Sequence, residues 1–600
     1  MADFQSPGVK PKPPFYVAVF LVIAGLVGFG LYRAGILAPE GKKDGQITAP
    51  ISADDLKNAT KPTNPADPAA KPADPAKPTV EAADSNAPTT VKEYTFTADA
   101  KLPAVQGVAG YKKMQNNTVK MALNVWAGWA PIIFANEGFK AKKEWVTPDG
   151  KTKFKLDLVL MDDPVTMRNA YASGDVHIGW ATVDMLPLFL DELKKDSRTM
   201  PRVFQQVDWS AGGDGIVVRD TITNVGQLRG KKVVLAGNSP SQYFVLNALI
   251  NGGVQPSEVE FVYTQTAFEA AAAFAAKKEL AGAVSWAPDI YNLSKVKGNK
   301  LLVTTGEANH LIADVWFARA DFAKENPQIV EALVRGFLDA VEQLDEQANK
   351  VKASQWMAEG YSLPPADTLG MLGDAHWTNY AENREFFLNQ NNPTNFERTW
   401  DTAYYLYKRI GKVNEKVAWD QVADFSVIQK LGKEEKYAKS QNKYQTSFAA
   451  KSVSEIKAES GEILTKTVVI HFFPNSSDLA HKIVKQQGGK SVEELYDPNV
   501  GFVVEEIGKM SGQFGAARIV IEGHTDASMK GQVPFDSVKT LSQARAEAVR
   551  DALLKKFPTL PKGQVAAEGM GWQRPADPAD PDNHAKNRRV EVKVYPLEAQ

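Results

Sequence analysis

Aromatic and acidic residues gather in the loops that follow short apolar runs in the middle of the sequence. VWAGWAP (125–131), GWATVD (179–184) and SWAPD (285–289) are three such loops. Indole rings attract cations through their π faces, and carboxylates accept hydrogen bonds from ammonium groups. The loops are poor in Arg and Lys, which a small anion would require. They therefore suit a cationic or aromatic nitrogenous solute.

One loop offers a different chemistry. GNSPSQ (237–242) opens a predicted helix. Free backbone N–H groups at such a place, aided by serine hydroxyls, bind sulfonate or phosphate without a basic side chain. The preference for a cation is therefore slight, and the sequence leaves the charge of the solute open.

The elements that must position these loops form an alternating pattern. Between about residues 116 and 432, short apolar runs alternate with helical patterns, which predicts an α/β domain with parallel-sheet character. ASGDVHIGWATVDM (172–185) and AAKKELAGAVSWAPDI (275–290) each combine a helix end, a buried strand and a loop with Trp and Asp. This echo predicts two similar lobes.

This order of strands resembles the periplasmic solute-binding proteins of nitrate, sulfonate and thiamine-precursor importers. The resemblance implies a bilobal α/β periplasmic-binding-protein (type II) domain at residues 111–435, which closes on a solute where strand ends meet. For any one Trp the alternative role is core packing, and for any one Asp it is a helix N-cap, as Asp163 before Pro164 illustrates. The candidate solute-binding residues are Trp129, Asp163, Asp184, Ser210, Asp214, Ser239, Gln242, Trp286 and Asp289.

Residues 461–600 have the pattern of a separate α+β unit. Strands are predicted at 465–472, 517–524 and 589–596, and a helix at 537–557. Asp526 follows the second strand and Arg545 lies on the helix. Taken alone, their spacing favours a turn carboxylate and a solvated arginine.

Four segments of this unit resemble the OmpA-like domain: HFFPNSSDL (471–479), IVIEGHTD (519–526), LSQARAEAV (541–549) and NRRVEV (587–592). The resemblance implies that Asp526 and Arg545 grip the diaminopimelate group of the peptidoglycan stem peptide. A carboxylate for its ammonium and a guanidinium for its carboxylate suit this zwitterion. Thr525 and Arg588 are further candidate wall contacts. Two departures are a lengthened loop at 527–540 and Val538 in place of a customary asparagine.

The N-terminal part carries an uncharged apolar run at residues 15–32, close to the ~20 residues that cross a bilayer. We expect a short tail at 1–14 and a transmembrane helix at 15–37, with a cleaved signal peptide as the alternative. Residues 38–110 are rich in Pro, Ala, Lys and Asp, which predicts a disordered linker. A second linker is predicted at 436–460.

Bulk composition and missing motifs limit the function. A chain of 600 residues exceeds one core, so it is multidomain. Its net charge of -1 gives no reason to expect nucleic acid, and the absence of cysteine excludes disulfides, thiolate catalysis and a lipoprotein anchor. Nucleophile-elbow, paired-histidine and dinucleotide motifs are also missing, so neither an enzyme nor a cofactor is predicted.

We predict a single-pass inner-membrane protein whose bulk lies in the bacterial periplasm, where it binds a small solute and, non-covalently, peptidoglycan. An ABC permease is a candidate partner. The alternative is a wall-anchored sensor or scaffold whose bilobal domain binds a protein or another envelope component.

Overall fold

The computed structural model describes residues 80–83, 85–487 and 490–597. The predicted transmembrane helix at 15–37 and most of the first predicted linker lie outside these residues. Within them, no helix combines the length and the apolar composition needed to cross a membrane.

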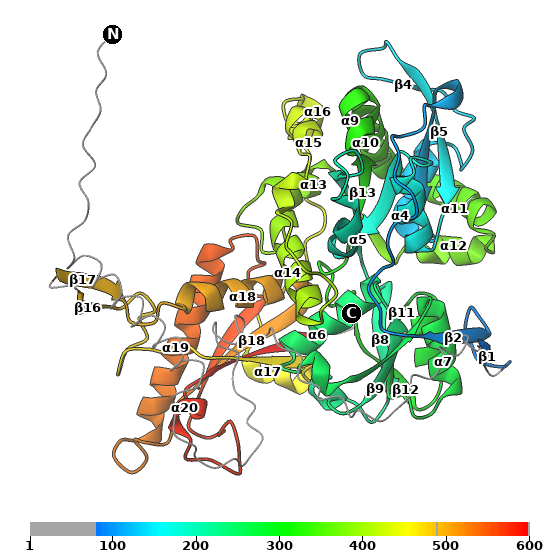
Figure 1. Ribbon diagram of the computed structural model, residues 1–600. Coiled ribbons are helices and arrows are strands. Elements are labelled where there is room, and N and C mark those ends of the chain that lie inside the picture. Colours follow the sequence, from blue (N-terminus) through cyan, green and yellow to red (C-terminus); the bar gives the residue numbers. More distant parts are fainter. Residues whose placement is uncertain (1–79, 84, 488–489, 598–600) are drawn as a thin grey trace, which may run out of the picture. The chain divides into compact units, whose positions relative to one another are not determined.

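The first lobe is built on a seven-stranded sheet with the order β14-β7-β13-β6-β3-β5-β4 (Figure 1). Its strands are β3 (Thr118–Leu123), β4 (Trp145–Val146), β5 (Lys153–Leu160), β6 (Ile178–Thr182), β7 (Pro201–Ser210), β13 (Ala313–Arg319) and β14 (Ala375–Trp377). Its helices include α3 (Ala130–Ala135), α4 (Pro164–Ala172), α5 (Met185–Leu193), α9 (Ala320–Glu325), α10 (Pro327–Gln343), α11 (Gln347–Tyr361), α12 (Pro365–Met371), α13 (Tyr380–Leu388), α14 (Phe396–Arg409) and α15 (Ser426–Leu431).

The second lobe has its own seven-stranded sheet, with the order β1-β2-β10-β9-β11-β8-β12. Strand β9 is parallel to both of its neighbours, whereas β8 is antiparallel to β11 and β12. The strands are β1 (Val80–Ala82), β2 (Glu93–Thr97), β8 (Asp214–Arg219), β9 (Lys232–Ala236), β10 (Glu260–Thr264), β11 (Gly282–Trp286) and β12 (Asn299–Thr304), and the helices are α6 (Pro240–Asn251), α7 (Ala267–Ala276) and α8 (Asp289–Ser294). Two sheets confirm the predicted bilobal architecture.

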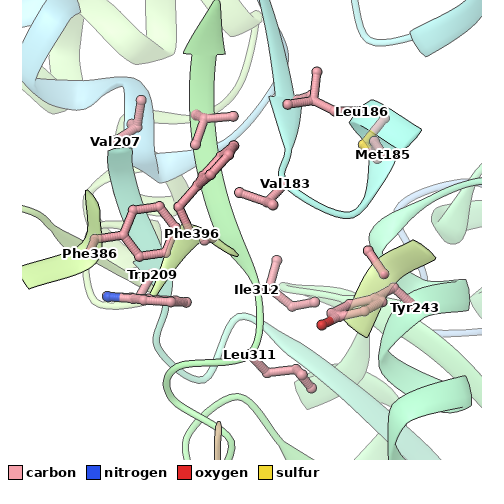
Figure 2. Packing of buried hydrophobic residues seen from close by; sticks show 14 of the residues in the cluster. Val183, Met185, Leu186, Val207, Trp209, Tyr243, Leu311, Ile312, Phe386 and Phe396 are labelled. Atoms are coloured by element: carbon pink, nitrogen blue, oxygen red, sulfur yellow. The ribbon is translucent and has the colours of Figure 1, made fainter. Parts of the chain in front are cut away.

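The chain passes between the lobes from β7 to β8 and returns from β12 to β13. We call these two segments the crossings. Figure 2 shows the apolar packing around them, with Val207 and Trp209 at the end of β7 and Leu311 and Ile312 before β13. All four side chains are buried. Polar groups carried at the crossings therefore lie in surroundings of low polarity.

The segment before the first lobe corrects the predicted linker at 38–110. Strand β2 pairs with β10, with Thr97 opposite Tyr263, so its end joins the sheet of the second lobe. The sequence EYTFT of β2 alternates in the manner of an edge strand, and its Tyr94 is buried. The Pro-rich composition of the surrounding linker obscured this short pattern.

The C-terminal domain is a four-stranded sheet with the order β15-β20-β18-β19. Strand β18 is parallel to β19, which the sequence did not predict, and antiparallel to β20. The predicted strand at 465–472 is shorter, and part of the predicted second linker is helix α17. The elements are α17 (Val453–Glu459), β15 (Leu464–Val468), the hairpin of β16 (Lys482–Gln487) and β17 (Lys490–Leu495), α18 (Val500–Gln513), β18 (Ala517–His524), α19 (Phe535–Lys556), β19 (Val565–Gly571), α20 (His584–Asn587) and β20 (Val590–Pro596).

Candidate functional sites

Carboxyl side chains converge where the two lobes are joined. On neighbouring strands, Asp208 of β7 stands opposite Asp314 of β13, and Asp214 begins β8 directly after the first crossing. Asp184 follows β6 and Asp374 precedes β14. The first four of these side chains are at least 95% buried, and Asp374 is half-buried. We call these five residues the acidic cluster.

Hydroxyl and indole groups hold individual carboxyls of the cluster. Trp126 Nε1 donates to Asp208 Oδ2 at 2.9 Å, and Ser210 Oγ donates to Asp214 Oδ2 at 2.7 Å. Tyr407 OH donates to Asp184 Oδ2 at 3.2 Å, so α14 contributes a third donor from another element. These donors are neutral. They orient the carboxyls without compensating a negative charge.

The approach to Asp208 requires a glycine. A Cβ added at Gly128 would lie 1.5 Å from Asp208 Oδ2. The helical turn at Ala127–Trp129 can therefore pass over the carboxyl only because residue 128 has no side chain. This close approach fixes the position of Asp208 relative to Trp126.

Burial raises the pKa of every carboxyl in the cluster. It raises the pKa of Asp184 and Asp374 to about 6 and that of Asp214 to about 7. Burial likewise raises the pKa of Asp208, and for Asp314 the adjoining Asp208 carboxyl adds to the effect. The cause is general, because a desolvated carboxylate is disfavoured and a second one nearby disfavours it further.

Several of the predicted solute residues come together at this place. Asp184, Ser210 and Asp214 are members or neighbours of the acidic cluster. Ser239 lies at the start of α6, where its carbonyl oxygen accepts a hydrogen bond from Tyr407 OH at 3.4 Å. The Gln242 side chain caps the same turn by accepting from Asn238 N at 2.7 Å. Both lobes thus contribute polar groups here.

Other predicted solute residues have partners elsewhere in the chain. Asp163 accepts from Thr166 N and caps α4, and Trp129 is fully buried with its indole donating to Asn124. These contacts favour structural roles. Trp286 packs edge to face on Phe268, with ring centroids 5.4 Å apart.

Asp289 is engaged by the segment that precedes the first lobe. It is fully buried, and its carboxylate accepts hydrogen bonds from both the backbone N and the hydroxyl of Thr90. Those bonds anchor the N-terminal segment to the second lobe. A structural role is therefore favoured for Asp289 as well.

The sequence missed part of the cluster. Asp208 and Asp374 lie on or beside strands of the first lobe's edge, and Tyr407 comes from a helix far along the chain. None of them belongs to the loops that follow parallel strands, where the sequence predicts the solute site. The signal that the sequence offered was the segment DWSAGGD (208–214), which begins with Asp208 and ends with Asp214.

In the C-terminal domain the structure brings Asp526 and Arg588 together. Asp526 follows β18, accepts from Ser528 N at 2.8 Å, and pairs through Oδ2 with Arg588 Nη1 at 3.0 Å. His584 Nδ1 lies 3.4 Å from Asp526 Oδ1. Burial alone would raise the pKa of Asp526, but the Ser528 bonds and the charges of Arg588 and His584 outweigh it and lower that pKa.

Arg545 projects from α19 beside this pair. Its Nε donates to Ser476 O at 3.0 Å, and its guanidinium lies over the Phe472 ring at 4.9 Å from the centroid. Burial lowers the pKa of Arg545, with the charge of Arg588 adding to this effect and that of Asp526 opposing it. Thr525 is buried, and its hydroxyl has no hydrogen-bond partner among the described residues.

Comparisons with known proteins match the two parts separately. Residues 202–348 match the family described as NMT1/THI5 like, and residues 494–589 match the OmpA family. The chain joins an NMT1/THI5-like domain to a C-terminal OmpA family domain. We call them the solute-binding-like domain and the OmpA domain.

Two curated relatives share these parts. The taurine-binding periplasmic protein of Escherichia coli (strain K12) is 29% identical over 304 residues, which are 49% of this chain and 87% of that protein. Outer membrane porin F of Pseudomonas aeruginosa is 37% identical over 93 residues, which are 15% of this chain and 25% of the porin. The second similarity therefore spans only a quarter of that relative.

Solved structures are similar to the solute-binding-like domain at low identity. The periplasmic aliphatic sulphonate binding protein SsuA from Escherichia coli is 16% identical with a TM-score of 0.40, covering 56% of this chain and 98% of that one. The nitrate-binding protein NrtA from Synechocystis PCC 6803 is 16% identical with a TM-score of 0.40, covering 54% of this chain and 89% of that one.

The OmpA domain also contains a group with metal-ligand chemistry, formed by the buried Glu522 and His524 and the partly buried Glu591. His524 Nε2 lies 3.6 Å from a carboxylate oxygen of each glutamate. Lys593 Nζ is 3.5 Å from Glu522 and 3.6 Å from Glu591, so a cation of the chain already faces both carboxylates. This compensation favours an internal charge network over a metal site.

Proposed function

We propose that this protein is a periplasmic solute-binding protein and that its OmpA domain attaches it non-covalently to peptidoglycan. The observation that carries the first half is the convergence of Asp184, Ser210, Asp214 and the start of α6 at the junction of two lobes. A pair of lobes joined by two crossings can open and close around a solute held between them. The similarity to a taurine-binding periplasmic protein supports the same role.

The wall-binding half of the proposal rests on Asp526 and Arg545. Arg588, which forms an ion pair with Asp526, is the third charged residue of this site. A diaminopimelate group carries an ammonium beside a carboxylate. Its ammonium would displace Arg588 and His584 from Asp526, and its carboxylate would bind the Arg588 guanidinium that this exchange releases together with the guanidinium of Arg545. Wall binding is then an exchange of ion pairs, which keeps the buried carboxylate compensated at every stage.

The apolar run at residues 15–32 would place the protein in the inner membrane as a single-pass anchor, with the rest of the chain in the periplasm. An ABC permease would receive the solute from the closed domain. Because the linker precedes β1, the membrane end and the wall-binding end lie on opposite sides of the solute-binding-like domain in the sequence.

A peptidoglycan pull-down with the full chain tests the wall site. Asp526→Ala and Arg545→Ala should each reduce the bound fraction at least about tenfold, because each leaves a charge of the ligand without its partner. Arg550→Ala is the matched control, since Arg550 lies on the same helix and pairs with the neighbouring Asp551 at the surface. Unchanged binding in both site variants would refute the assignment.

Thermal-shift screening of the full chain tests the solute site. A solute that binds the folded domain raises its unfolding midpoint with increasing concentration. Amines, thiamine precursors, sulfonates, nitrate and phosphate are the probes. Saturable stabilisation by one class supports a solute-binding function, whereas no response to any class contradicts it and favours a scaffold.

A further inference from the structure

We infer that the solute is a cation whose ammonium group is received by the acidic cluster. This inference rests on the proposed function and names the chemical class of its solute. It is carried by the placement of the carboxyls, by the absence of a compensating cation in the described chain, and by unpaired polar atoms directed at the same place.

The placement concentrates negative charge between the lobes. Asp314 lies between Thr182 on β6 and Asp208 on β7 in one row of the sheet. Carboxylates directly opposite each other across a strand pair repel. Asp214 reaches the same region from the other lobe, and the charges of Asp184 and Asp374 both act on it. An arrangement of this kind is unfavourable unless protons or a cation neutralise it.

The described part of the chain supplies no such cation. No Lys, Arg or His in residues 80–83, 85–487 and 490–597 forms an ion pair with any carboxyl of the cluster. By contrast, the buried Glu522 and the partly buried Glu591 of the OmpA domain both face Lys593. The carboxyls of the acidic cluster thus lack the cationic side-chain partner that Glu522 and Glu591 have in the OmpA domain.

Unpaired polar atoms point to a ligand at the same place. The Tyr243 hydroxyl on α6 is fully buried and has no hydrogen-bond partner among the described residues. Figure 2 shows this hydroxyl turned toward Ile312 at the second crossing. Burial raises the pKa of Tyr243, and the charge of Asp184 adds to this effect. Among the described residues Asp208 Oδ1 is likewise buried without a hydrogen-bond partner, although protonation lets the Asp208 and Asp314 carboxyls hydrogen-bond to each other.

These atoms fit an ammonium group. A hydroxyl oxygen and carboxylate oxygens accept the hydrogen bonds that an ammonium donates. The start of α6 offers less to an anion than the sequence suggested, because Ser239 Oγ already donates to Ala236 O at 2.8 Å. Any anion bound there would also face Asp184, which Tyr407 links to the same turn.

Cation binding should release protons. Since burial raises the pKa of Asp214 to about 7 and that of Asp184 to about 6, part of the cluster is protonated near neutral pH. An ammonium group favours the ionised carboxylates and lowers these pKa values on binding. Proton release then accompanies solute binding and disappears when the carboxyls concerned are replaced.

The test uses the full chain with putrescine, choline, taurine, ethanesulfonate and nitrate as probes. Thermal shift at pH 7 identifies binders, and calorimetry in phosphate and Tris buffers measures the protons released. We expect putrescine or choline to stabilise the protein with proton release, and ethanesulfonate and nitrate to have no effect. Taurine, which carries both charges, should bind only through its ammonium and therefore also release protons.

Variants separate the cluster from general effects. Asp208→Asn and Asp214→Asn should weaken cation binding at least about tenfold and reduce proton release, whereas Asp220→Asn, at an exposed position directly after β8, should change neither. If ethanesulfonate or nitrate stabilises the protein and the cations do not, the inference is wrong while the proposed function stands. If no probe binds, the proposed function fails and the inference fails with it.

Discussion

At the scale of single residues, the acidic cluster makes the stability of the solute-free protein depend on pH. A carboxyl whose folded-state pKa is raised contributes stability that is complete below its unfolded pKa, near 4, and is lost as pH rises through the folded value. For Asp214 that folded pKa is about 7. From pH 5 to pH 8, the ionisation of Asp214 alone should lower the free energy of unfolding by about 2 kcal/mol.

Denaturant unfolding of the solute-free chain at both pH values measures this loss. Asp214→Asn should reduce the measured loss by about 2 kcal/mol, since an amide does not ionise, and Asp220→Asn should leave the loss intact. The buried Glu522 of the OmpA domain does not interfere in this window. The charges around Glu522 lower its pKa to about 2, so its contribution is lost only in acid. Equal stability at pH 5 and pH 8 would contradict the burial of an uncompensated cluster.

A second prediction at this scale concerns Gly128. Gly128→Ala should displace Asp208 and break its bond with Trp126, because the new Cβ would overlap Asp208 Oδ2. We expect a loss of about 1–3 kcal/mol in stability and a clear loss of solute affinity. Gly370→Ala is the control, since nothing lies within 4 Å of a Cβ there. Unfolding midpoints and calorimetric binding of both variants provide the comparison, and unimpaired solute binding by Gly128→Ala would argue against Asp208 as a ligand.

The residues that the sequence predicted and those it missed differ in where they lie. Asp184 and Asp214 were found because they adjoin short apolar runs. Asp208 was missed because it lies within a ten-residue strand, where the pattern gives no reason to separate a buried acid from a half-exposed one. Burial of a polar side chain depends on tertiary packing, and local pattern does not record it.

At the scale of elements, the short helix α20 adds His584 to the wall site. His584 Nδ1 lies 3.4 Å from Asp526 Oδ1, where the imidazole occupies part of the space that the ammonium of the stem peptide needs beside this carboxylate. Removal of the imidazole should therefore strengthen peptidoglycan binding about two- to fivefold, the range expected for a partly exposed pair.

Peptidoglycan pull-down with His584→Ala tests this contribution. The variant should retain a larger bound fraction than the unmodified chain. His481→Ala, in a different part of the OmpA domain, should behave like the unmodified chain. Equal or weaker binding by His584→Ala would show that the imidazole does not compete with the stem peptide at Asp526.

Elements with strong local patterns were predicted well, and those defined by pairing were not. The predicted strand at 517–524 and the predicted helix at 537–557 correspond to β18 and α19. Strand β19 (VAAEGMG) has few large apolar residues, and its register comes from β18 beside it. Strand β2 likewise owes its place to β10. Such strands depend on their partners more than on their own sequence.

At the scale of the whole molecule, the segment that leads into the solute-binding-like domain binds both lobes. In the second lobe β2 pairs with β10 and Thr90 binds Asp289. In the first lobe, Ala109 N donates to Ala172 O and Lys112 N to Gly174 O. Arg319, whose side chain is fully buried, also donates to Ala109 O. Any movement of one lobe against the other must accommodate this segment.

Two truncations of the chain test how much the segment stabilises the domain. Removal of residues 1–79 should leave the unfolding midpoint of the solute-binding-like domain unchanged. Removal of residues 1–110 should lower it, because Asp289 loses its donors, Arg319 loses an acceptor, and the edge of β10 is exposed. A buried group left unsatisfied costs about 1–3 kcal/mol, and each kcal/mol lowers the midpoint of a domain of this size by about 2–4 °C. A fall of about 5 °C or more is therefore expected in scanning calorimetry.

Thr90→Val in the full chain, which removes only the hydroxyl bond to Asp289, should reproduce a smaller part of that fall. Equal midpoints for the two truncated chains would mean that the segment lies on the lobes without stabilising them.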